Sequence, residues 1–178
     1  MKIATIVAND YTTNLITPQD LRKIGAVWSS LDAHNRWLSD NVVCYSNESA
    51  RIAVNLGVNN NNHFFINSAN FDAIGKQKNI HYFEGNFPGE FTRPDEIIAM
   101  HLAGMYFDLV ILLGFDLSHS DDGDQARYIS SAMAAIQTRE NTQWVAVLPN
   151  NKVSERLVAL DNFTTDTIDS ILTLTQSQ

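Results

Sequence analysis

The chain has 178 residues, 44% hydrophobic and 18% charged, a composition that excludes wholesale disorder and allows a single domain. Its acidic residues outnumber the basic ones by 20 to 12, and the net charge of -8 disfavours a broad surface for nucleic acid or anionic membranes. A local basic pocket for one anionic ligand stays compatible with this charge. One cysteine excludes an internal disulfide, and no stretch reaches the roughly 20 apolar residues of a membrane span, so a cytoplasmic location is expected.

Short apolar runs alternate with helix-period segments along the chain, which is typical of β-α units. We expect one Rossmann-like α/β domain over residues 1–178, with a three-layer architecture and a mainly parallel sheet of about seven strands. The runs are apolar on both faces, so helices are expected on both sides of the sheet. Strands are predicted over residues 2–8, 26–29, 42–45, 63–67, 80–84, 108–114 and 143–148.

Helix starts carry capping signals. The motif TPQD places Thr17 at an N-cap with Asp20 three residues on, and TRPD repeats the arrangement with Thr92 and Asp95. The strongest helical period lies in residues 125–138, where apolar residues recur at i, i+3, i+4 and i+7. Further helices are predicted over residues 48–56, 151–160 and 166–175.

Polar residues follow nearly every predicted strand, at the edge where open parallel sheets bind ligands. They include Asn9, Asp10, Ser29, Ser30, Ser46, Asn47, Asn67, Ser68, Glu84, Asn86, Asp116, Ser118, His119, Asp121, Asp122, Asn150 and Asn151. Helix capping is the favoured explanation for Ser46, Asn67, Ser68 and Asn151, and Asp116 is equally typical of a turn.

His119 lies in the loop HSDDGD, after the most hydrophobic predicted strand and before a helix. A histidine there can act as a general base. The same loop also suggests a divalent-cation site at Asp121, Asp122 and Asp124, although three acids before a helix equally complement its dipole. The glycine-rich dinucleotide fingerprint, the P-loop motif and the nucleophile elbow are all missing from the sequence, which disfavours the enzyme classes that use them.

Four segments carry a family resemblance: MKIATIVAND, FTRPDEIIAMHLAGMYFDLVILLGFD, HSDDGD and WVAVLPNN. Their order and content resemble the bacterial lipooligosaccharide sialyltransferases of glycosyltransferase family 42. They are similar, more loosely, to pyrophosphokinase-like Rossmann-type proteins. The likeness covers most of the chain.

The resemblance implies inverting, metal-independent transfer of a sugar from a CMP-type donor, with no added cofactor. It assigns catalysis to His119, as the base, and to Asp116. The residues matched to ligand binding are Asn9, Asp10, Ser29, Thr92, Arg93 and Asn150. Arg93 would pair with phosphate in place of a backbone contact, because the family's glycines are replaced here by Ala8 and Asp10.

One departure keeps other functions open. The family has a lid between the positions of Asp116 and His119, which are only three residues apart here. A lid excludes water from a reactive donor, so the chain could instead be a non-catalytic nucleotide-binding or assembly module, including a homo-oligomer. A third alternative is a divalent-metal phosphotransferase or hydrolase site built on Asp116, Asp121, Asp122 and Asp124.

Overall fold

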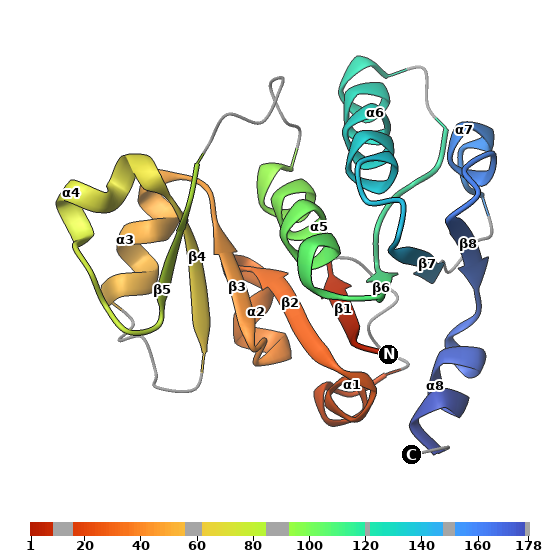
Figure 1. Ribbon diagram of the computed structural model, residues 1–178, viewed down its shortest axis with the longest axis horizontal. Helices are drawn as coiled ribbons and strands as arrows, with labels where there is room; N and C mark the ends of the chain where they lie inside the picture. Colours follow the sequence, from red (N-terminus) through yellow and green to blue (C-terminus); the bar gives the residue numbers. More distant parts are fainter. Residues whose placement is uncertain (9–15, 56–61, 85–92, 120–121, 148–151, 177–178) are drawn as a thin grey trace.

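The computed structural model describes residues 1–8, 16–55, 62–84, 93–119, 122–147 and 152–176. Within these residues one parallel sheet of eight strands runs through the molecule (Figure 1). The strands are β1 Ile3–Val7, β2 Ala26–Ser30, β3 Asn41–Cys44, β4 His63–Asn67, β5 Ile80–Phe83, β6 Leu109–Leu113, β7 Gln143–Val147 and β8 Phe163–Asp166. The helices are α1 Pro18–Ile24, α2 Leu31–Trp37, α3 Asn47–Asn55, α4 Phe71–Ile74, α5 Pro94–Tyr106, α6 Gly123–Gln137, α7 Glu155–Val158 and α8 Ile168–Gln176, with a 3-10 turn at Ser68–Asn70.

The strands lie in the order β5-β4-β3-β2-β1-β6-β7-β8, and every neighbouring pair is parallel. The first five strands extend the sheet in one direction from β1, and the last three extend it in the other. All seven predicted strands are present within one or two residues of their predicted bounds. The eighth, β8, was not predicted.

Helices cover both faces of the sheet, as expected for strands that are apolar on both sides. On one face Ala4 and Ile6 of β1 pack with residues of α5, α6 and α7. On the other face Ile3 and Val7 pack with residues of α1, α2 and α8, and α3 packs on β3 and β4. The Rossmann-like three-layer prediction is therefore confirmed.

Two predicted helix starts have different outcomes. Thr17 caps α1 as predicted, because its hydroxyl accepts from the Asp20 N–H at 3.2 Å and the Asp20 carboxylate reaches back to Thr17. At α5 the prediction was wrong for Asp95: the N-cap residue is Arg93, and Asp95 instead accepts a hydrogen bond from the Tyr45 N–H, just after β3. The predicted helix 151–160 is reduced to the four residues of α7, while 125–138 and 166–175 correspond to α6 and α8.

The helix α5 is buried over most of its surface, since it packs between the sheet and α6. Seven consecutive or nearly consecutive residues, from Ile97 to Gly104 without His101, are buried. An apolar helix of this kind has its position fixed by packing, which places its first residues at the carboxyl edge of the sheet. Among the described residues no helix combines the length and the apolar character needed to cross a bilayer.

Candidate ligand-binding site

The direction of strand addition reverses between β1 and β6, which creates a topological switch point. The two strands remain joined where they end, because the Ala8 N–H donates to the Leu113 carbonyl at 2.9 Å. In doubly wound sheets ligands bind in the crevice outside the carboxyl ends of the strands at such a point. Among the described residues, Asp116 and His119 follow β6 at this edge.

Five predicted site residues lie outside the described part of the chain: Asn9, Asp10, Thr92, Asp121 and Asn150. Their roles stay predictions. The described site residues Ser29, Arg93, Asp116 and His119, with Asp122 and Asp124 of the metal alternative, can be placed individually.

Asp116 shapes the loop that follows β6. Its Oδ1 atom accepts from the Ser118 hydroxyl at 2.6 Å and from the Ser118 N–H at 3.2 Å, a local Asx-type turn. The side-chain amide of Gln125 in α6 donates to the Asp116 carbonyl at 2.8 Å and to the Ser118 carbonyl at 3.3 Å. These contacts are those of the turn alternative weighed for Asp116, and its catalytic role stays a prediction.

His119 lines a cavity of about 560 Å³ between the loop that follows β6 and the segment around the start of α7. The other lining residues are Ser118, Lys152, Val153, Ser154, Glu155 and Arg156. The Ser154 N–H donates to the Leu117 carbonyl at 2.9 Å, so the loops that follow β6 and β7 are held together. The cavity is lined by one histidine, one lysine and one arginine but by a single acid, Glu155, although the whole chain carries a net charge of -8.

Lys152 and Arg156 were not predicted as site residues. They are both exposed and lie four positions apart, on either side of the start of α7. The signal in the sequence that could have identified them is their spacing, two basic residues at i and i+4 shortly after a predicted strand. Guanidinium and ammonium groups close to a histidine favour a phosphate or carboxylate ligand.

Ser29 lies at the carboxyl end of β2 but is fully buried. Its hydroxyl accepts from the Ser39 hydroxyl at 2.6 Å and donates to the Ser30 carbonyl at 2.9 Å. Both hydrogen-bonding functions are thus used within the chain, so this geometry gives no support to a ligand contact by Ser29. The next residue, Ser30, is the N-cap of α2.

Arg93 starts α5 in the left-handed backbone region, with φ 55° and ψ 62°. Its guanidinium carbon lies 5.0 Å from the centre of the Tyr128 ring, a cation-π contact between α5 and α6. The buried Tyr128 hydroxyl donates to Glu96 Oε2 at 2.5 Å, and burial, then Glu96, raises the pKa of Tyr128. Arg93 remains exposed and so keeps access to solvent at the ligand-binding edge.

Asp95 is a further titratable group at this edge that the sequence did not identify as a site residue. Its Oδ1 atom accepts from the Tyr45 N–H, just after β3, at 2.8 Å. Burial raises the pKa of Asp95 to about 6, and burial together with Asp95 and Asp32 raises the pKa of the Cys44 thiol. A carboxyl that titrates near neutral pH at a ligand-binding edge is a candidate for proton transfer.

Replacing Asp95 with asparagine is expected to remove a pH dependence of stability. Between about pH 4 and pH 6 the folded protein keeps a proton on Asp95 that the unfolded chain has released. The free energy of unfolding therefore falls as the pH rises through this interval. Asp95→Asn keeps an oxygen for the Tyr45 N–H and should be more stable than wild type above pH 6, by about 1–3 kcal/mol.

Urea titrations at several pH values would measure this difference. Asp72→Asn removes one exposed carboxylate and serves as the charge-matched control. A difference between Asp95→Asn and wild type that grows as the pH is lowered would contradict the assignment.

Among the described residues, no group of three His, Cys, Asp or Glu side chains is arranged to hold a metal ion, so the structure adds no support to the metal alternative. Asp124 pairs with Arg127 at 2.6 Å on the exposed side of α6. Asp122 is the N-cap residue of the same helix. Asp122 and Asp124 thus occupy positions that complement the helix dipole.

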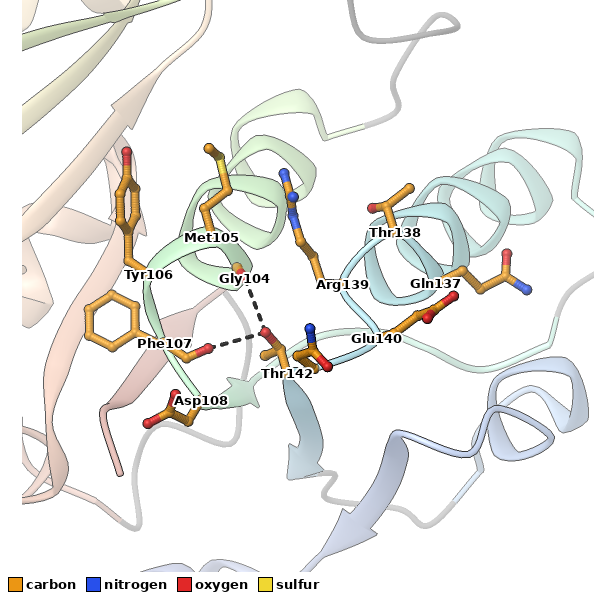
Figure 2. Close-up of a pocket in the computed structure, with 11 residues that line it drawn as sticks. Gly104, Met105, Tyr106, Phe107, Asp108, Gln137, Thr138, Arg139, Glu140 and Thr142 are labelled. Carbon is orange, nitrogen blue, oxygen red and sulfur yellow. Dashed lines mark hydrogen bonds between the residues drawn. The ribbon is translucent and has the colours of Figure 1, made fainter.

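A second cavity, of about 640 Å³, lies at the opposite edge of the sheet, between the ends of α5 and α6. Figure 2 shows Arg139 extending between these two helices, with Thr142 below it. The Thr142 hydroxyl donates to the carbonyls of Gly104 and Phe107, at 3.0 and 3.1 Å. This cavity lies at the amino ends of β6 and β7, away from the edge where doubly wound sheets bind ligands.

Comparison with protein-family models, with curated proteins and with solved structures gave no match for this chain. The likeness to the sialyltransferases therefore depends on the motifs quoted above. The activity that it implies stays a prediction.

Proposed function

We propose that the chain binds a phosphorylated small molecule, a nucleotide or nucleotide-sugar of the CMP type, at the carboxyl edge of its sheet. The observation that carries the proposal is the cavity lined by His119, Lys152 and Arg156, between the loop that follows β6 and the start of α7. A concentration of basic side chains at one edge of an acidic protein indicates selection for an anion at that place. The type of nucleotide comes from the family resemblance alone.

Arg156 and Lys152 have different parts in this proposal. The planar guanidinium can donate two parallel hydrogen bonds to phosphate oxygens, whereas the ammonium acts as a point charge. His119 lines the same cavity from the loop that follows β6, and the proposal assigns it to the acceptor hydroxyl. Glu155 also lines the cavity and would be expected to favour a ligand that carries hydroxyl groups as well as phosphate.

Arg156→Glu is expected to weaken binding of the phosphorylated ligand by about 10- to 100-fold, the loss of one charge-assisted pair. Calorimetric titration with inorganic phosphate, CMP and CDP would measure it. Arg51→Glu makes the same charge change on the exposed side of α3 and is the matched control. Absence of binding to wild type, or equal affinities in the two variants, would refute the proposal.

If the bound molecule is a sugar donor, the reaction that fits best is inverting glycosyl transfer. His119 would take the proton of an acceptor hydroxyl, whose oxygen attacks the anomeric carbon. The bond from that carbon to the phosphate oxygen breaks, and the phosphate leaves with the electron pair. The basic side chains would stabilise the negative charge of the leaving nucleotide.

A binding module without catalysis is the second candidate, and one observation favours it. The loop between Asp116 and His119 is short and is held by Gln125 and Ser154, so it provides no lid over the cavity. A third candidate, metal-dependent phosphotransfer or hydrolysis at Asp116, Asp121, Asp122 and Asp124, requires activity that is lost in excess EDTA. Activity that persists in EDTA would exclude it.

A further inference from the structure

Two histidines face each other on neighbouring strands at the far end of the sheet. His63 is the first residue of β4 and His81 is the second residue of β5. Phe65 pairs with His81 in the strand register, which places His63, Phe65 and His81 on the same face. The His63 Nδ1 and His81 Nε2 atoms are 2.8 Å apart, and both side chains are exposed.

Stacking on a neighbouring aromatic ring limits the orientation of His81. The His81 ring stacks on Phe65 with centroids 5.0 Å apart and an angle of 22° between the planes. Phe65 in turn lies 4.8 Å from the buried Trp28 of β2. A ligand side chain that is held by its neighbours loses little conformational entropy on binding.

The surroundings of His81 favour its neutral imidazole form, because burial, and then the neighbouring His63, lowers the pKa of His81. A hydrogen bond between two ring nitrogens requires one to carry the proton and the other to accept it. A metal ion bound by both nitrogens takes the place of that shared proton, which moves to the other nitrogen of its ring. Neutral imidazole is the common metal-binding form of histidine.

We propose that His63 and His81 form a two-histidine site for Zn²⁺ or a similar late first-row divalent ion, which bridges β4 and the edge strand β5. With Zn–N bonds of 2.0–2.1 Å and angles of about 90–110°, the two nitrogens must be about 2.9–3.4 Å apart. A small rotation of either exposed imidazole about its Cβ–Cγ bond brings the observed N···N distance of 2.8 Å into this range. Imidazole nitrogens suit Zn²⁺, Ni²⁺ and Cu²⁺.

Water completes the coordination, because no third His, Cys, Asp or Glu joins the pair within the part of the chain that the structure describes. The site is therefore open and exchangeable, unlike the four-ligand sites that hold structural zinc. It is independent of the proposed nucleotide site, since it lies toward the amino ends of β4 and β5 whereas His119 follows the carboxyl end of β6. An ion there would tie the edge strand β5 to its only neighbour in the sheet.

Calorimetric titration of the untagged, metal-free chain with ZnCl₂ would test the site. One equivalent of Zn²⁺ is expected to bind to wild type. His63→Ala and His81→Ala should each weaken binding by at least about tenfold, since loss of a direct ligand costs no less than loss of a supporting residue. His119→Ala, which removes an exposed histidine at the other edge, should bind Zn²⁺ like wild type.

Thermal melting gives a second measurement on the same samples. Zn²⁺ at about 100 times its Kd should raise the Tm of wild type by about 5–10 °C and leave the two histidine variants within about 2 °C. Nitrogen-15 spectra of the wild-type imidazoles, which need no variant, should change on Zn²⁺ addition at two histidines. Wild-type affinity in both single variants, no binding by wild type, or spectral changes confined to other histidines would overturn the proposal.

Discussion

His119→Ala is expected to lower the turnover of the proposed glycosyl transfer by about 100- to 10,000-fold, the usual contribution of a positioned general base. Nucleotide affinity should change much less, because Lys152 and Arg156 still line the cavity. A fall in kcat without an equal rise in KM is the pattern of a group that acts only in the transition state. Assays with a CMP-activated sugar under saturating donor would measure both constants.

His119→Asn is the companion variant, because it keeps a polar side chain of similar size and removes the basic nitrogen. Both substitutions should give the same loss if proton removal is the role of His119. Unchanged turnover in both variants would show that His119 is not the base, whereas absence of turnover in wild type would leave the binding-module candidate in place. Binding of CMP that survives in each variant would show that the cavity itself is intact.

Gly25→Ala is expected to destabilise the fold by at least about 3 kcal/mol, which corresponds to a fall in Tm of about 6–12 °C. A Cβ atom added to Gly25 would lie 2.1 Å from the Ile3 carbonyl oxygen and 2.8 Å from the Ile3 carbonyl carbon. Both are backbone atoms of β1, the strand at the switch point, so neither can rotate away. Relief of the clash requires α1 and β2 to shift relative to β1.

Gly123→Ala makes the same chemical change at the start of α6, where no atom lies within 4 Å of the added carbon. It should leave the stability unchanged or raise it by up to about 1 kcal/mol, since alanine favours the helix. Thermal melts of both variants beside wild type would test the pair. If Gly25→Ala melts within about 2 °C of wild type, the close packing of Gly25 on β1 is wrong.

The strands could be predicted because each is a short apolar run flanked by polar residues. The exception, β8, has one buried residue, Phe163, and three exposed residues with little apolar pattern. The segment forms a strand because it pairs with β7 at the edge of the sheet. Pairing between distant segments cannot be predicted from the periodicity of one segment.

From the sequence, only those residues of the candidate site that directly follow a predicted strand could be identified. His119 was identified from its loop, whereas Lys152 and Arg156 meet it only through the contact of Ser154 with Leu117. Asp95 was taken as a helix cap, and its raised pKa depends on burial beside Tyr45, which lies fifty residues earlier in the chain. Distances of this kind come from the fold and not from spacing in the sequence.

The strand order also governs how the chain reaches its native state. The strands from β1 to β5, and those from β6 to β8, each pair with a strand that is next to them in the sequence. The seam of β1 and β6 is different: Lys2 and Asp108, which are hydrogen-bonded beside it, are 106 positions apart. Closing that seam costs the most loop entropy, so we expect it to be a late step in folding. A molecule that binds across the crevice would bind only chains in which this seam has closed, and would thereby act as a thermodynamic clamp on the two halves of the sheet.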